Sequence, residues 1–198
     1  MDKGFYIGKY TIIAYGILCL STSCAQNSYQ PKQSTEIDFE LFEKVDANIS
    51  GVHFTNELTE EFNNGINRFE FDYFYNGAGV GVADLNNDGL QDLFLVGNQV
   101  DSKLYLNKGG FKFEDISSKA NINQNKGWST GVTFADINTD GWLDIYVSQG
   151  GPLGYDRGNR LYINQGDLTF KEESSKYGLD YKGISTQSVF FDYDRDGD

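Results

Sequence analysis

The chain repeats a segment of its own sequence, and this repeat constrains the fold more than any other feature. Residues 79–96 align with residues 131–148, and a third copy begins at residue 188. The equivalent aspartates are Asp84, Asp136 and Asp192, so successive copies are 52 and then 56 residues apart. Self-similarity at such an interval is typical of propellers and solenoids. We therefore expect one small structural unit that recurs along the chain.

Each copy is predicted to form four short β-strands. In the first complete copy, the pattern predicts strands near residues 79–83, 92–97, 103–107 and 111–116. Residues 107–110 and 164–167 carry the Asn and Gly that tight hairpin turns need. Four antiparallel strands in a repeat of this length describe a propeller blade. The predicted fold class is therefore all-β, a β-propeller of four-stranded antiparallel blades, of which two complete copies and part of a third are present.

The loop between the first two strands of each copy reads Asp-x-Asn/Asp-x-Asp-Gly-x-x-Asp. Oxygens at positions one, three and five of a tight turn converge, and the glycine at six permits the reversal. A backbone carbonyl at seven and a carboxylate at nine would complete an oxygen shell suited to Ca²⁺. The predicted metal ligands are Asp84, Asn86, Asp88, Leu90 and Asp92 in the first loop, Asp136, Asn138, Asp140, Trp142 and Asp144 in the second, and Asp192, Asp194 and Asp196 in the third.

Two other interpretations of this loop have to be weighed. An EF-hand requires a bidentate Glu at position twelve, where this chain has Leu95 and Val147 within apolar strand patterns. The loop is therefore not an EF-hand. Asp, Asn and Gly are also ordinary turn residues, and that interpretation stays open for a single loop. Recurrence of the same oxygen-bearing positions in three loops favours metal binding.

The repeats resemble the FG-GAP/VCBS repeat family. The resemblance rests on these loops and on two further segments, Leu-Tyr-Leu-Asn-x-Gly at 104–109 and Leu-Tyr-Ile-Asn-x-Gly at 161–166. The family occurs in the propellers of integrin α-subunits and in bacterial surface proteins. The resemblance covers residues 78–198 strongly and 39–77 weakly, although the literal Phe-Gly and Gly-Ala-Pro elements are absent. It implies a seven-bladed propeller with calcium-rigidified loops, protein or glycan ligands and few catalytic roles.

The N-terminal residues predict export and lipidation. Two lysines precede an apolar run, Tyr10–Leu20, that is too short to span a bilayer, so residues 1–24 are read as a signal peptide. The run ends in Leu-Ser-Thr-Ser-Cys, which resembles the lipobox in which a cysteine, here Cys24, is acylated. The aliphatic residue usually sits three positions before that cysteine, whereas Leu20 sits four before. Ordinary secretory cleavage near Ala25 is the alternative; lipidation predicts an outer-membrane lipoprotein, periplasmic or surface-exposed.

The remaining chain divides by composition and by the repeat. Residues 25–38 read as a flexible tether, and residues 39–77 as an N-terminal strand region with a strand within 69–75. Residues 78–130 form repeat 1, residues 131–186 repeat 2, and residues 187–198 the start of repeat 3. The sequence stops inside the third loop, so we expect the working protein to be longer.

The charge balance limits the partners. Asp and Glu number 29 against 16 Lys and Arg, which argues against nucleic acid or an anionic membrane surface as a partner. Many of the aspartates lie in the three loops. The two cysteines, Cys19 and Cys24, both belong to the predicted signal region, so disulfides are not expected to hold the fold.

Weaker features favour structural roles. Gly77, Gly79 and Gly81 precede no predicted helix, so they indicate a strand rather than a dinucleotide loop. His53 has no partner at catalytic or metal spacing. The aromatics Trp128, Trp142 and Tyr155 are expected to pack in or between blades, with sugar stacking as the alternative. The insertion at residues 150–158 is a candidate contact loop.

The leading functional hypothesis is a calcium-stabilised, lipid-anchored binding module of the bacterial cell envelope that recognises a glycan or a protein. The sequence marks no catalytic residue and no cofactor other than Ca²⁺. The alternative is part of a polysaccharide lyase or hydrolase whose catalytic residues lie in a missing C-terminal part.

Overall fold

The computed structural model describes residues 42–122 and 127–195. The chain divides into two units, residues 1–43 and 44–198, and every described strand lies in the second. The predicted signal peptide, Cys24 and the tether fall outside the described residues, as does Asp196. Among the helices that are described, none is long and apolar enough to cross a bilayer.

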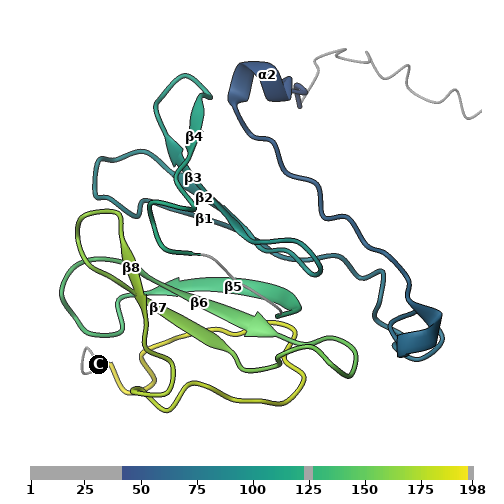
Figure 1. Ribbon diagram of the computed structural model, residues 1–198. Coiled ribbons are helices and arrows are strands. Elements are labelled where there is room, and N and C mark those ends of the chain that lie inside the picture. Colours follow the sequence, from purple (N-terminus) through teal and green to yellow (C-terminus); the bar gives the residue numbers. More distant parts are fainter. Residues whose placement is uncertain (1–41, 123–126, 196–198) are drawn as a thin grey trace, which may run out of the picture. The chain divides into compact units, whose positions relative to one another are not determined.

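The first repeat folds into one four-stranded antiparallel sheet. Its strands are β1 (Val80–Ala83), β2 (Asp92–Leu95), β3 (Lys103–Asn107) and β4 (Phe113–Asp115), hydrogen-bonded in that order (Figure 1). These bounds differ by at most two residues from the predicted ones. The hairpin between β3 and β4 is closed by a bond from the Lys108 N–H to the Lys112 carbonyl, 2.7 Å long.

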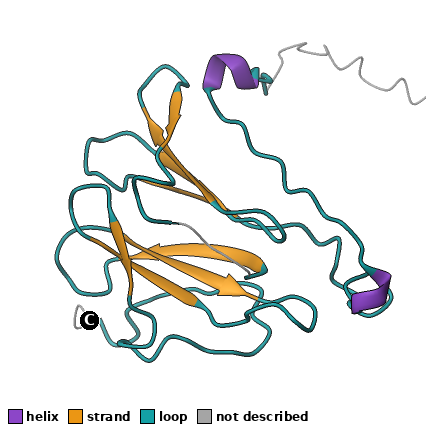
Figure 2. Cartoon of the chain, in the orientation of Figure 1, coloured by secondary structure: helices purple, strands orange, loops and turns teal. Residues whose placement is uncertain are grey.

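The second repeat forms an equivalent sheet, which confirms the predicted fold class. Its strands are β5 (Ser129–Ala135), β6 (Asp144–Gln149), β7 (Arg160–Asn164) and β8 (Phe170–Glu172), again in chain order and antiparallel. Pairing of β5 with β6 is interrupted by a bulge between Ser129 and Gly131. Among the regular elements of the described residues, strands outnumber helices (Figure 2), and the two sheets have the strand order of propeller blades.

The two sheets share one apolar core. The residues buried in it are Ala83, Leu85, Phe94, Val96, Leu104, Leu106, Ile116, Ala120 and Ile122 from the first repeat and Val132, Ile145, Val147, Tyr162 and Phe170 from the second. Gly81 allows the close approach, because a Cβ there would lie 2.5 Å from a ring carbon of Phe134. The core therefore depends on a small residue on β1 facing a large one on β5.

The start of the third repeat continues this stacking on the far face of the second sheet. Phe190 packs edge-on against Tyr146, with ring centroids 5.4 Å apart. It belongs to a cluster built on buried Tyr146, Leu161 and Ile163. The second sheet thus packs against a neighbouring repeat on both of its faces.

The N-terminal segment before β1 contains no strand in residues 42–77, which corrects the strand predicted within 69–75. It holds a short helix, α2 (Ala47–Ser50), and a 3₁₀ turn, η1 (Phe62–Asn64). The Asn67 side chain accepts hydrogen bonds from the N–H groups of Phe69 and Glu70, which starts a series of turns. Phe71 and Phe74, three residues apart, then bury against Trp128. Aromatic and polar residues alternate within 69–73, which predicts a strand. The two buried aromatic residues, Phe71 and Phe74, are three positions apart, which fits a turn.

Replacing Phe94 tests the shared core. Phe94 is fully buried in β2, so Phe94→Ala is expected to lower the free energy of unfolding by about 3–5 kcal/mol through lost burial and a residual cavity. Urea denaturation measures this loss. The matched control is Phe111→Ala, because Phe111 is 72% exposed. Equal losses for the two variants would contradict the proposed core.

Candidate metal-binding loops

The two complete Asp-rich loops connect the first two strands of each sheet. The first joins β1 to β2 and the second joins β5 to β6, so strands flank both loops and the rejection of an EF-hand is confirmed. Both loops bend at the same positions: Asn87 and Thr139 have φ of 56° and 57°, and Gly89 and Gly141 have φ of 84° and 87°. Glycine at position six supplies this left-handed backbone without steric cost.

Asp84, at position one, holds the first turn together. One of its carboxylate oxygens accepts from the Asp88 N–H at 3.1 Å and the other from the Gly89 N–H at 2.8 Å. The side-chain oxygen of Asn86 accepts from the same Asp88 N–H at 3.3 Å. Oxygens from positions one and three are therefore turned toward a common point inside the loop.

Asp88, at position five, is exposed and closes the turn from the other side. It accepts from the Leu90 N–H at 2.8 Å and from the Asn86 side-chain amide at 2.9 Å. The Asn86 hydrogen bond, followed by that of Leu90, lowers the pKa of the Asp88 carboxyl, because both favour its charged form. Asp88 is thus an anion that offers lone pairs toward the loop and toward solvent.

Asp92, at position nine, is buried and has a different environment. One of its oxygens accepts from the Leu85 N–H at 3.0 Å, and the other from the Asn107 N–H at 2.8 Å. Burial raises the pKa of this carboxyl more than the two donors lower it, and the charges of Asp88 and Asp84 raise it further. Asp92, the predicted ligand at position nine, therefore also connects the loop and β2 to β3 through its hydrogen bonds.

The second loop reproduces this geometry. Asp136 accepts from Asp140 and Gly141 N–H groups, Asp140 from Trp142 N–H, and buried Asp144 from the N–H groups of Ile137 and Asn164. The Asn138 amide donates to Asp140 at 2.8 Å. Burial likewise raises the pKa of Asp144. The two loops thus differ in sequence at positions two, four, seven and eight and agree in every one of these hydrogen bonds.

The third loop is described only in part. Asp192 and Asp194 are exposed, and Asp192 accepts a hydrogen bond from the Arg195 N–H. Arg195 has φ of 64°, the same left-handed conformation as position four of the complete loops. The described part of this loop therefore begins the same turn.

The oxygen donors of the complete loops fit a Ca²⁺ ion by their chemistry. Each loop combines carboxylates with an Asn side-chain oxygen, and the carbonyls of Leu90 and Trp142 occupy position seven. Within residues 42–122 and 127–195, no three His, Cys, Asp or Glu side chains form a group that could hold a metal ion by themselves. Amide and backbone oxygens would have to complete the shell, and the ligand set stays a prediction.

The loops coincide with a segment that matches a known repeat family. Residues 84–147 match the family model of the FG-GAP-like repeat, from the first loop into β6. The chain contains an FG-GAP-like repeat. The FG-GAP resemblance predicted from the sequence is confirmed.

The chain is similar to cartilage acidic proteins of three vertebrates. Cartilage acidic protein 1 of Xenopus tropicalis and of Homo sapiens are each 27% identical over 125 residues, covering 61% of this chain. The Mus musculus protein is 29% identical over 103 residues, or 50% of the chain. The chain spans 18% of the length of the first two relatives and 15% of the third.

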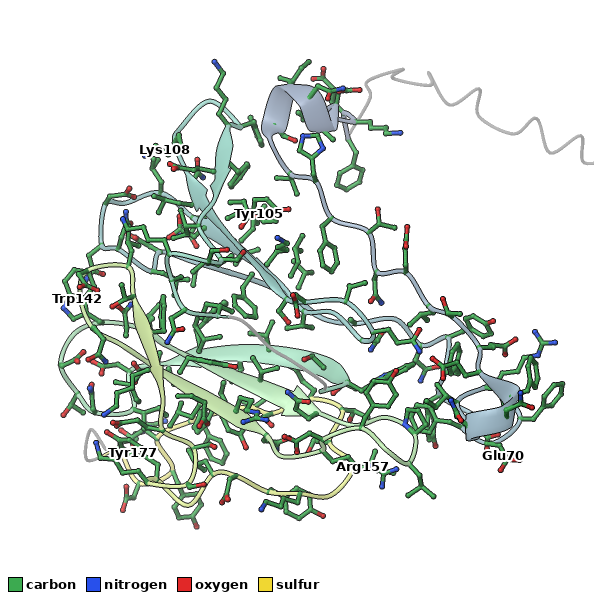
Figure 3. All side chains as sticks on the ribbon, in the orientation of Figure 1. Glu70, Tyr105, Lys108, Trp142, Arg157 and Tyr177 are labelled. Carbon is green, nitrogen blue, oxygen red and sulfur yellow. The ribbon has the colours of Figure 1, made fainter. Side chains whose placement is uncertain are left out.

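The other candidate residues are found in separate places. Trp128 is 1% exposed and packs against Tyr155, which confirms a core role for it. Trp142 is half-buried and lies over Gly166 of the β7–β8 hairpin. His53 is exposed, and its backbone carbonyl accepts from the Tyr105 hydroxyl at 2.6 Å. Figure 3 labels Tyr105, which lies on β3, and Trp142, which lies in the second Asp-rich loop.

Asp92→Asn separates the structural role of position nine from any metal role. The amide has one acceptor oxygen, so its NH₂ group would face the N–H of either Leu85 or Asn107. We expect a loss of about 1–3 kcal/mol in the free energy of unfolding, because a buried donor is left unpaired. The loss should appear in chelator as well as in calcium. Asp72→Asn changes an exposed carboxylate and is the matched control. If Asp92→Asn lowered the free energy of unfolding only in the presence of calcium, the structural role would be contradicted.

Proposed function

We propose that this chain belongs to a calcium-stabilised, lipid-anchored β-propeller module of the bacterial cell envelope that binds a glycan or a protein. FG-GAP-like repeats indicate a β-propeller-like binding module. The finer parts of the proposal, namely calcium, the lipid anchor and the ligand class, rest on the loops, on the N-terminal sequence and on the pocket described below. The role we propose is binding and not catalysis.

The observation that carries the calcium proposal is the agreement between the two complete loops. Asp84 and Asp136 accept from the same two N–H positions, at distances that agree within 0.1 Å. The residues that differ between the loops, such as Leu90 and Trp142, contribute only backbone atoms to this arrangement. What the loops share is thus an oxygen-rich interior, the environment that Ca²⁺ favours.

A cation would also offset repulsion inside each loop. Three carboxylates lie within nine residues, at Asp84, Asp88 and Asp92, and one of them is buried. The charges of Asp88 and Asp84 raise the pKa of Asp92, so they disfavour its charged form in the folded loop. A divalent cation held among them would stabilise the folded state by binding it in preference to the unfolded chain.

Calcium is expected to raise the melting temperature of the full chain. At a free concentration about 100 times its dissociation constant, one site adds about 2.7 kcal/mol to the free energy of unfolding. Extracellular calcium modules bind with dissociation constants of about 10⁻⁴ to 10⁻³ M, so tens of millimolar calcium are needed. Thermal melts in calcium, in magnesium at equal ionic strength and in chelator measure the effect. Identical melting temperatures in all three would disprove the calcium proposal.

Paired substitutions locate this effect. Asp84→Asn with Asp136→Asn should abolish most of the calcium-induced shift, because each change removes a charged oxygen from a loop. Asp72→Asn with Asp101→Asn removes the same charge from exposed positions outside the loops. This control pair should keep the full shift. An equal reduction in both pairs would attribute the effect to net charge alone.

The anchor proposal rests on Cys24 and the apolar run before it. In a bacterial host, an alkyne-tagged fatty acid should label the protein, and Cys24→Ala should remove the label because its thiol is the proposed acylation site. Cys19→Ala changes the other cysteine, inside the apolar run, and should leave the label in place. An unlabelled protein whose mature N-terminus lies near Ala25, measured by mass spectrometry, would support ordinary secretion instead.

A further inference from the structure

A pocket lies at the end of the second sheet away from the Asp-rich loop. That loop precedes β6, whereas the pocket is bounded by Gly150 and Gly151, which follow β6. Its volume is about 200 Å³. Four separate segments supply its walls, and the lining residues are Phe71, Tyr73, Asn76, Gly77, Ala78, Trp128, Thr130, Gly150, Gly151, Ile184, Ser185 and Thr186.

Aromatic rings form a fixed floor and an accessible rim. Trp128 is 1% exposed and meets the rings of Phe71 and Tyr155 edge-on, at centroid distances of 5.8 Å and 5.3 Å. Tyr73 is 58% exposed and stands edge-on to Phe71 at 5.8 Å. Packing thus fixes the Trp128 ring in the floor, while the ring of Tyr73 remains accessible to a ligand in the pocket.

The glycine wall is held close to this floor. A Cβ on Gly151 would lie 2.4 Å from the Cβ of Trp128, so only glycine fits there. The Gly150 N–H donates to the Trp128 carbonyl at 2.9 Å, and the Arg157 guanidinium donates to the Gly151 carbonyl at 3.0 Å and 2.7 Å. The insertion at residues 150–158, which is predicted as a contact loop, therefore supplies one wall of the pocket through the backbone of Gly150 and Gly151.

The lining is polar in places but carries no charge. Asn76 and Thr186 contribute an amide and a hydroxyl to the lining, and none of the twelve lining residues is acidic or basic. The Thr130 hydroxyl donates to the Ser148 and Ser185 carbonyls, and the Ser185 hydroxyl accepts from the Asn159 amide. In the whole chain 23% of residues are charged and the net charge is −13. A charged ligand entering this pocket would lose hydration without gaining a counter-ion. The complementary ligand is therefore uncharged, with an apolar face and hydrogen-bonding edges.

We propose that this pocket binds one pyranose ring of an uncharged glycan. The C–H face of a pyranose packs on an aromatic ring, here the exposed ring of Tyr73, and its hydroxyls exchange hydrogen bonds with amide and hydroxyl groups. A volume of about 200 Å³ lies below the roughly 300–1,000 Å³ of pockets for drug-sized ligands, so the pocket suits a small group such as a single ring. This inference rests on the proposed binding function and names its ligand class and its site.

The two tryptophans allow a direct test. Trp128 lines the pocket, whereas Trp142 belongs to the second Asp-rich loop, at the other end of β6. The ¹⁵N-labelled full chain is titrated with methyl glycosides of glucose, galactose, mannose and xylose, and Trp142→Phe assigns the two indole signals. We expect saturable shifts of the Trp128 indole signal with at least one neutral glycoside and none of the Trp142 signal.

A pair of neighbouring tyrosines tests the rim. Tyr73→Ala should weaken binding about tenfold, the loss expected for one aromatic platform, and Tyr73→Phe should retain it. Tyr75→Ala is the matched control, since Tyr75 is 59% exposed and lies outside the pocket. Thermal melts show that each variant is folded. Equal weakening by Tyr73→Ala and Tyr75→Ala would overturn the site.

Three other outcomes would overturn the proposal. They are the absence of shifts with every glycoside, shifts confined to Trp142, and tighter binding of glucuronate than of methyl glucoside. The melting temperatures in calcium and in chelator test the calcium proposal independently of the glycoside titrations. Calcium stabilisation without a glycoside shift would reject the pocket and leave the calcium module standing, and the converse result would reject calcium and keep the pocket.

Discussion

The repeat depends on a buried carboxylate that ends each Asp-rich loop. Asp92 accepts one N–H from the loop, at Leu85, and one from the end of β3, at Asn107. Each of these groups would be costly to bury alone, and together they satisfy one another. Asp144 makes the equivalent pair of bonds in the second sheet. The shape of the exposed turn is therefore fixed from inside the sheet.

Contacts between the sheets follow from these fixed positions. Asn164, placed by its bond to Asp144, donates its side-chain amide to the Leu85 carbonyl of the neighbouring repeat at 2.9 Å. Asn87 donates in the other direction, to the Gly141 carbonyl at 3.1 Å. Asn87 in the first loop and Asn164 at the end of β7 thus bridge the two sheets. The same asparagines that look like turn formers in the sequence are also links between repeats.

Residue patterns predicted the repeated part of the fold well, because strand alternation and turn chemistry are local. Strand β3 was placed at its observed bounds, and the loop flanks were correctly read as strands. The region around Phe71 and Phe74 was misread, because its conformation depends on Trp128, more than 50 residues away in sequence. The pocket could not be predicted for the same reason: its walls come from four distant segments. Only the spacing of three between Phe71 and Phe74 hinted at a turn.

The hydrogen bonds within the loops bear on what a cation would do for this fold. Asp84, Asp88 and Asp92 already hold the turn through backbone N–H groups. Each carboxylate oxygen has a second lone pair, so a cation could bind without displacing these bonds. Zinc fingers, by contrast, are unfolded without metal, because metal ligation supplies most of their folding energy. Here the sheets share an apolar core and the turn has backbone hydrogen bonds of its own, so Ca²⁺ would be one of several contributions to the stability of the repeat.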